Sequence, residues 1–267
     1  MSRYLLHFLS WIIASPHAVL AAGDVTTATS RASAKDVTVP PFAVGILVTP
    51  STPSVNELGT VQFTVRLQST TGALSQPLPN TQITWGPYML GMSSVSSTGL
   101  ATTKAVYENT HAAVAVNYGP FYNNGIVQVI NSAPDNYGNY AADGINDGWQ
   151  VMHFGLNSSN AAPDKDPDQD GQTNLFEYTA GTLPMDASSM LRFRIEAVNG
   201  QSAHRRLIFT PNVTGRTYSI FKSSTLSPGL WLPVTGASQS TSGDERILTD
   251  ANASAPNLFY RGSVTKP

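Results

Sequence analysis

Residues 166 to 177 place acidic and amide side chains at a spacing that few structures use. The run reads D-P-D-Q-D-G-Q-T-N-L-F-E and fills every specified position of the pattern D-x-[DN]-x-[DN]-G-x5-E. Gly171 stands where the chain must turn sharply and where a side chain would obstruct the turn. An acidic run can also be a solvated loop without a ligand. The complete match to the pattern nevertheless favours a binding site for an ion.

The oxygen atoms of this loop suit calcium, a hard cation that takes about six to eight oxygen ligands. The predicted ligands are the side chains of Asp166, Asp168, Asp170, Asn174 and Glu177 and the backbone carbonyl of Gln172. Glu177 is expected to bind through both carboxylate oxygens, and Asn174 directly or through a water molecule. We therefore predict calcium as the cofactor of this segment. Because Glu177 lies on the helix that follows, ion binding would also order that helix.

A less complete loop of the same kind precedes the first one. Its first, fifth, sixth, ninth and twelfth positions are Asn139, Asp143, Gly144, Asp147 and Gln150. Two anionic ligands are missing, so this loop either binds an ion weakly or borrows a ligand from its neighbour. The candidate ligands of a second metal ion are Asn139, Asp143, Asp147 and Asp164. His153 is not expected to bind, because calcium prefers oxygen.

Charge is distributed unevenly along the chain. Between residues 135 and 186 there are nine acids and one lysine, a local net charge of −8, whereas the whole chain carries −2. An acidic segment of this kind attracts cations and repels nucleic acid. Basic patches with interleaved aromatic residues are missing elsewhere in the sequence, so we do not expect a nucleic-acid partner.

Composition indicates a β-rich extracellular protein. The chain of 267 residues has 12% charged residues, 21 glycines and 18 prolines, which is typical of short strands with frequent turns. It contains no cysteine, which excludes disulfide bridges and cysteine-ligated zinc. A metal ion is therefore the stabilising cross-link that remains available to small domains.

The N-terminus has the features of an export signal. Residues 1–21 combine Arg3, an apolar run and a small-residue exit, and they are too short to span a membrane. Residues 22–41 are rich in Thr, Ser and Ala and predict a flexible linker. Because no second run reaches spanning length, we expect a secreted or cell-surface protein that does not span the membrane.

Six short apolar runs predict an antiparallel β-sandwich over residues 42–133. The predicted strands are residues 42–49, 59–68, 81–86, 102–107, 112–118 and 125–131. Val61, Phe63, Val65 and Leu67 alternate with polar residues and should face the core. Trp85, near the middle of a strand, is the predicted core aromatic residue.

The acidic segment over residues 134–189 should be helical on either side of the calcium loop. Residues 149–154 predict a short helix with Trp149 and Met152 facing inward. Residues 173–180 predict a second helix that ends at Gly181. The side chains available for packing on the second helix are Leu175, Phe176 and Tyr178.

Strand patterns return over residues 190–267. The predicted strands are residues 191–198, 205–210, 217–222, 231–234, 246–249 and 259–264. Trp231 and Phe259 are interpreted as core residues rather than as a sugar-binding platform. The predicted fold is thus mainly β, with two small antiparallel β-sandwich modules joined by a short helix–calcium loop–helix segment.

Two parts of the chain resemble known families. Residues 79–85 and 94–102 resemble a bacterial immunoglobulin-like domain. Residues 143–150, 166–182 and 184–186 look like the thrombospondin type 3 or dockerin-like calcium-binding module of secreted bacterial proteins, with Leu183 where that module often has an aspartate. The second resemblance implies calcium and a structural, joint-forming role. It does not imply dockerin-type partner binding, because paired duplicated helices are not evident.

Motifs of catalysis are missing from the sequence. It contains no G-x-S-x-G, P-loop, H-E-x-x-H or Rossmann glycine pattern. We therefore predict a secreted, non-catalytic, calcium-binding modular protein with a structural or adhesive role, in which calcium stiffens the joint between β domains. The alternative is a carbohydrate- or surface-binding accessory module of an extracellular degradative system. Its aromatic row would be Tyr118, Phe121 and Tyr122, and a hydrolase ranks last.

Overall fold

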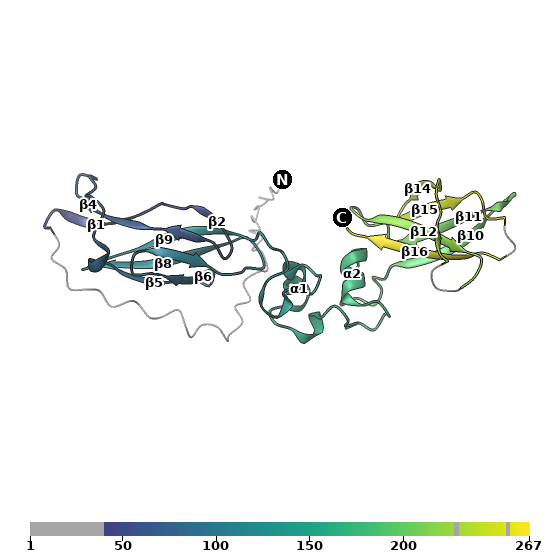
Figure 1. Ribbon diagram of the computed structural model, residues 1–267, viewed down its shortest axis with the longest axis horizontal. Coiled ribbons are helices and arrows are strands. Elements are labelled where there is room, and N and C mark those ends of the chain that lie inside the picture. Colours follow the sequence, from purple (N-terminus) through teal and green to yellow (C-terminus); the bar gives the residue numbers. More distant parts are fainter. Residues whose placement is uncertain (1–39, 227–229, 255–256) are drawn as a thin grey trace, which may run out of the picture. The chain divides into compact units, whose positions relative to one another are not determined.

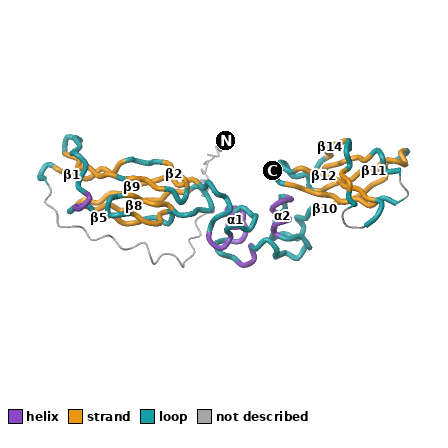
Figure 2. Tube along the Cα trace, viewed as in Figure 1, coloured by secondary structure: helices purple, strands orange, loops and turns teal. Residues whose placement is uncertain are grey.

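The computed structural model describes residues 40–226, 230–254 and 257–267 (Figure 1). The predicted signal peptide, residues 1–21, and nearly all of the predicted linker, residues 22–41, lie outside the described residues. The described chain is mainly β, with several antiparallel sheets and two short α-helices (Figure 2). The main class predicted from the sequence is therefore confirmed.

Contacts divide the chain into two compact units. The first contains Thr60–Thr102 and Ala112–Val127, and the second contains Ser54–Gly59, Thr103–His111 and the described residues from Gln128 onward. The acidic segment and the C-terminal strands both belong to the second unit. Contacts between these two segments therefore lie within one compact body.

The strands before the acidic segment form three sheets. They are β1 (Ala43–Thr49), β2 (Ser54–Asn56), β3 (Thr60–Gln62), β4 (Thr64–Ser69), β5 (Thr84–Pro87), β6 (Met92–Val95), β7 (Leu100–Thr103), β8 (Thr110–Tyr118) and β9 (Phe121–Ile130). The sheet orders are β1-β4, β3-β7-β6 and β2-β9-β8-β5. β2 pairs with β9 in parallel, so the prediction of purely antiparallel pairing was wrong at this edge.

The predicted alternation in β3 and β4 is confirmed, because Val61, Phe63, Val65 and Leu67 are all buried. Phe63, and not Trp85, is the fully buried aromatic residue of this core. Trp85 is only half-buried, since it lies on β5, the last strand of its sheet. Its ring covers Gly99, where an added Cβ would lie 2.7 Å from Trp85 Cζ2.

Other strand bounds differ from the sequence prediction in ways that turns explain. The predicted strand 81–86 is divided between a short 3-10 helix, η1 (Asn80–Gln82), and β5. The predicted strand 102–107 ends at Thr103, and β6 was not predicted. β6 and β7 are joined by a turn in which the Ser96 side chain accepts a hydrogen bond from the amide of Leu100 at 3.0 Å.

The acidic segment contains two α-helices, α1 (Asp147–Phe154) and α2 (Asn174–Ala180), and two 3-10 helices, η2 (Gly138–Tyr140) and η3 (Ser159–Ala161). α1 begins two residues earlier than predicted, because Asn146 accepts a hydrogen bond from the amide of Trp149 at 3.0 Å and caps the helix. The inward orientation predicted for Met152 was wrong, since its side chain is 65% exposed. None of the helices described is both long enough and apolar enough to cross a membrane.

α2 ends as predicted and begins one residue later than predicted. Thr173 caps its start, and Gly181 ends it in the left-handed conformation with φ 84°. Tyr178 packs on the ring of Trp149, with 5.4 Å between the ring centroids. Leu175 and Phe176 are exposed, so their predicted packing was wrong.

The C-terminal strands form two further sheets around one core. They are β10 (Arg192–Val198), β11 (Gln201–Thr210), β12 (Thr217–Ser223), β13 (Leu232–Pro233), β14 (Ser238–Ser242), β15 (Glu245–Asp250) and β16 (Phe259–Thr265). The sheet orders are β10-β11-β15-β14 and β13-β12-β16. Five buried residues from both sheets form the core: Leu207, Phe209, Tyr218, Ile220 and Leu248.

The core aromatic residues of this part are Phe209 and Tyr218, whose ring centroids are 5.0 Å apart. Phe259 is exposed and Trp231 only half-buried, so the prediction that both belong to the core was wrong. Trp231 lies instead beside Arg261, whose guanidinium carbon is 5.3 Å from the ring centroid. Side chains of β16 alternate between the two faces, and Phe259 and Arg261 share the outer one.

Candidate metal centre

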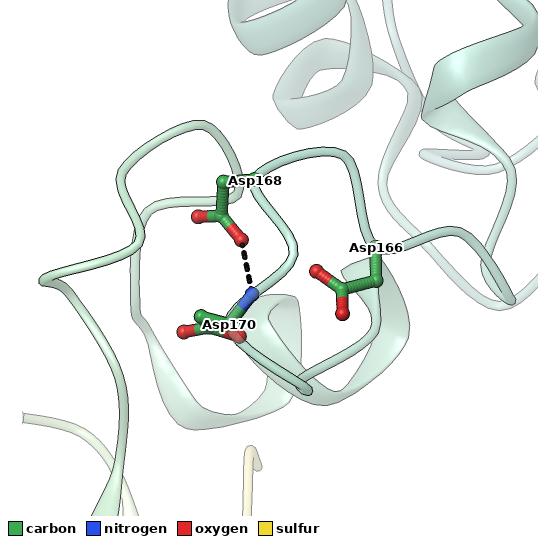
Figure 3. Close-up of side chains that lie close together, drawn as sticks. All are labelled: Asp166, Asp168 and Asp170. Atoms are coloured by element: carbon green, nitrogen blue, oxygen red, sulfur yellow. Dashed lines mark hydrogen bonds between the residues drawn. The ribbon is translucent and has the colours of Figure 1, made fainter.

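Three aspartates of the loop before α2 bring their carboxylates together. Asp166, Asp168 and Asp170 each offer an oxygen atom within 4.8 Å of the other two (Figure 3). Each lies two residues from the next, so the backbone must curl to bring them to one side. Gly171 makes the sharpest part of this curl with φ 92°, a conformation that favours glycine.

Loop amides hold each carboxylate by one of its two oxygens. The amide of Gly171 donates to Asp166 Oδ2 at 2.9 Å, that of Asp170 to Asp168 Oδ1 at 3.2 Å, and that of Gln172 to Asp170 Oδ1 at 2.7 Å. The second oxygens, Asp166 Oδ1, Asp168 Oδ2 and Asp170 Oδ2, are buried and have no hydrogen-bond partner among the described residues. The loop therefore orients three carboxylates and leaves one oxygen of each available to a ligand.

Glu177, on the first turns of α2, completes this arrangement. Its side chain is fully buried, and neither carboxylate oxygen has a hydrogen-bond partner within the part of the chain that the structure describes. Burial, followed by the charges of Asp168, Asp170 and Asp166, raises its pKa to about 8. The nearby Thr182 hydroxyl opposes this shift but forms no hydrogen bond with the carboxylate. A bound cation would compensate the buried charge.

Asn174 offers a further oriented oxygen. Its amide nitrogen donates to the carbonyls of Asn160 and Ala162, each at 2.7 Å. Because both acceptors require N–H groups, the amide orientation is fixed and Oδ1 remains a buried acceptor without a described partner. All five predicted side-chain ligands thus carry at least one buried oxygen that lacks a hydrogen-bond partner, as the oxygen-rich environment of calcium requires.

Gln172 connects the loop to the C-terminal sheets. Its side-chain amide donates to the Leu191 carbonyl at 3.0 Å and accepts from the Leu191 amide at 3.0 Å. Leu191 directly precedes β10. The sequence predicted a role only for the backbone carbonyl of Gln172. The role of its side chain depends on a contact between distant residues that sequence spacing does not reveal.

The second loop has a different first residue from the one predicted. The amide of Gly144 donates to Asp135 Oδ2 at 3.0 Å, as the amide of Gly171 does to Asp166. Asp135, rather than Asn139, therefore occupies the first position. Asn139 is exposed in η2, and the Asp164 side chain is 79% exposed with its carboxylate 4.0 Å from Lys165 Nζ. Among the described residues, neither side chain forms a hydrogen bond with the second loop.

Asp143 and Asp147 do lie in this loop as predicted. Asp143 Oδ1 accepts from the amide of Ile145 at 2.9 Å, and Asp147 Oδ2 accepts from the amides of Asn136 and Tyr137 at 2.7 and 2.8 Å. Burial raises the pKa of Asp147, and the charges of Asp135 and Asp143 raise it further against the effect of those amides. Sequence spacing missed Asp135 because Asp143 follows it by eight positions, whereas Asp170 follows Asp166 by four.

His153 and Trp149 on α1 are not positioned as ligands. Their rings pack together with centroids 4.6 Å apart. Burial lowers the pKa of His153, which favours the neutral imidazole. His153 therefore contributes to the packing of α1.

Comparisons with known proteins show no close relative. No protein-family model matches the chain, and no curated protein matches it. Among solved structures, domains 4–9 of the surface layer protein SbsC match at 10% identity and a TM-score of 0.26, over 84% of this chain and 31% of that one. The chain therefore spans about a third of that structure's length. Domains 5–6 of the S-layer protein SbsC match at 11% identity and a TM-score of 0.26, over 84% of this chain and 96% of that one.

The titin domains Z1Z2, solved in complex with telethonin, match at 11% identity and a TM-score of 0.23, over 84% of this chain and 91% of that one. All of these proteins are modular, but TM-scores this low support no conclusion about shared fold or function. The functional argument therefore rests on the loop geometry itself.

Proposed function

We propose that this chain is a secreted or cell-surface structural protein, non-catalytic and built from β-sandwich modules, in which calcium bound by Asp166–Glu177 stiffens the segment between the modules. The single observation that carries the proposal is the environment of Glu177. A fully buried carboxylate with two unpartnered oxygens lies near three oriented aspartates. An oxygen-binding divalent cation is the simplest partner for this group.

The charge of the loop explains why the loop and α2 would be well ordered only when calcium is bound. Asp166, Asp168, Asp170 and Glu177 carry four formal negative charges, and the neighbouring Lys165 contacts Asp164 instead. Without an ion the charges of the three aspartates repel one another, and together with burial they hold Glu177 mostly in its protonated form, which weakens the loop. With calcium bound they become ligands, so the loop and α2 are ordered together.

Three contacts would transmit this order to the C-terminal sheets. The Arg216 guanidinium donates to the Tyr178 carbonyl at 3.0 Å, near the end of α2. Lys266, just beyond β16, places its ammonium 3.5 Å from the ring centroid of Tyr178. The Gln172–Leu191 pair holds the start of β10. Calcium binding at the loop would therefore fix an element on which the C-terminal strands directly pack.

The structure gives less support to the carbohydrate-binding alternative. Tyr118, the first residue of its predicted aromatic row, is buried. The half-buried rings of Phe221 and Trp231 do not form an open platform, because Arg261 lies over both, 5.1 and 5.3 Å from their centroids. The structural role is therefore the better supported of the two.

Thermal unfolding of the exported chain with calcium and with chelator tests the proposal. Extracellular modules of this kind bind calcium with a Kd of about 10⁻⁴ to 10⁻³ M. A tenfold excess over Kd stabilises the folded state by about 1.4 kcal/mol, so Tm should rise by several degrees. Glu177→Gln should remove the part of the rise that comes from this loop.

Asp164→Asn is the matched control, because it removes an exposed acid beside the loop and should leave the calcium response intact. Equal Tm values of the wild-type chain with calcium and with chelator would refute the proposal. A response to calcium that is undiminished in Glu177→Gln would assign the ion to another site.

A further inference from the structure

The second loop also contains buried oxygens without partners. Asp147 and Gln150 are fully buried on α1, yet Asp147 Oδ1 and Gln150 Oε1 have no hydrogen-bond partner in the described part of the chain. The same holds for Asn136 Oδ1. Buried polar atoms are nearly always paired, so three such atoms in one loop require an explanation.

The orientation of Gln150 is fixed by its own donors. Its amide nitrogen donates to Asp143 Oδ2 at 2.8 Å and to the Ala161 carbonyl at 2.9 Å. Both acceptors require N–H groups, so Oε1 is held as a free acceptor beside the Asp143 carboxylate. Asn174 in the first loop is oriented in the same way, by the carbonyls on either side of Ala161.

Asp147 has a similar division of its oxygens. Oδ2 accepts from two backbone amides, whereas Oδ1 has no described partner. The first loop divides the oxygens of Asp166, Asp168 and Asp170 in this manner too. Asp147 therefore resembles the aspartates of the first loop, because backbone amides hold one of its oxygens and leave the other without a partner among the described residues. Both oxygens of Asp135 and both oxygens of Asp143 accept hydrogen bonds within the second loop.

We propose that the second loop binds its own calcium ion through Asp143, Asp147 Oδ1 and Gln150 Oε1, with Asn136 Oδ1 and Asp135 supplying further oxygen. This ligand set excludes Asn139 and Asp164. Oxygen-only donors select a hard divalent cation, and an irregular mixture of carboxylate and amide oxygens suits calcium better than magnesium, which demands a near-ideal octahedron. The proposal does not require the first loop to bind an ion.

The second ion should bind more weakly than the first. Its loop contains three carboxylates, Asp135, Asp143 and Asp147, whereas the first loop and α2 supply four. Affinity in such loops follows the number of charged ligands. Gln150 occupies the position of Glu177, so Gln150→Glu supplies the missing carboxylate and should lower the second Kd about tenfold or more.

Equilibrium dialysis against calcium, with metal analysis of folded protein, counts the ions. We expect two calcium ions per chain in the wild type, one in Glu177→Gln, one in Asp147→Asn and none in the double variant. Asp164→Asn should retain two ions. Asparagine keeps an oxygen for the amides of Asn136 and Tyr137, so circular dichroism of Asp147→Asn should match the wild type. A tenfold excess of magnesium should not displace either ion.

The outcomes separate this proposal from the proposed function. A wild-type chain that binds one ion and loses it in Glu177→Gln overturns the second site and keeps the first. Two ions retained in Asp147→Asn also overturns the second site, and an unchanged count in Glu177→Gln overturns the first. If Asp147→Asn does not fold, Gln150→Glu decides, because an unchanged second Kd contradicts the proposal.

Discussion

Buried carboxylates in this protein are of two kinds, and their partners distinguish them. Asp250 is buried but accepts from Lys222 Nζ at 2.8 Å, the Tyr260 hydroxyl at 2.9 Å and the Asn252 amide at 2.9 Å. Burial alone would raise its pKa, but these donors outweigh it and lower the pKa. Glu177 has no such donors, and its pKa is raised to about 8. The first kind of carboxylate has all its partners within the protein, whereas the second has two oxygens without a partner among the described residues, which the proposed ion would bind.

The lowered pKa of Asp250 predicts a loss of stability in acid. Because the folded state holds the carboxylate charged, this contribution is fully present above the unfolded pKa of about 4 and is lost as pH falls through the lower folded value. Chemical denaturation between pH 7 and pH 3 should show a smaller decrease for Asp250→Asn than for the wild type. Equal decreases in the two proteins would contradict the assignment.

At the scale of elements, the end of α2 is a point of close packing. Gly181 has φ 84°, and a Cβ added there would lie 2.7 Å from Val213 Cγ1. Val213 lies between β11 and β12, in the C-terminal part of the chain. The glycine therefore ends the helix and also permits the helix to approach those strands.

Gly181→Ala should destabilise the protein by about 2 to 4 kcal/mol. About 1 kcal/mol comes from the left-handed conformation, and the remainder comes from overpacking against a stiff β-branched side chain. Gly215→Ala is the matched control, because Gly215 has φ 76° and no atom within 4 Å of the added Cβ. Urea unfolding should show a clearly larger loss for Gly181→Ala, and equal losses would indicate that the contact with Val213 is unimportant.

At the scale of the molecule, the acidic segment and the C-terminal sheets belong to one compact unit. The Gln172 side chain makes two hydrogen bonds to the backbone just before β10, while its own backbone carbonyl is the predicted calcium ligand. One residue thus connects the proposed ion site to a sheet. Calcium should therefore change the dynamics of strands that provide no ligand.

Gln172→Ala should separate these two effects. Calcium affinity should change less than threefold, because the backbone carbonyl remains, but calcium should no longer slow hydrogen exchange in β10. Met185→Ala, an exposed side chain in the same connection, is the control and should retain the protection. Hydrogen exchange with and without calcium measures both variants. Protection of β10 that persists in Gln172→Ala would contradict a connection through this side chain.

The sequence alone determined those features that depend only on residues close together in the chain. The Asp166–Glu177 pattern predicted that Asp166, Asp168 and Asp170 would bring their carboxylates together, Gly181 predicted where α2 ends, and the alternation from Val61 to Leu67 predicted a buried face. In each case neighbours in the sequence supply the geometry, so spacing alone carries the information.

Tertiary structure decided the features that depend on residues distant in the chain. Which aromatic residues form the cores follows from strand order, and this order buries Phe63 and Phe209 while leaving Trp85 and Phe259 partly exposed. Asp135 takes its place in the second loop only because the chain folds back over a longer segment than the calcium-loop pattern specifies. Periodicity indicates which face of an element is apolar, but only packing shows how much of that face is covered, because neighbouring elements supply the cover.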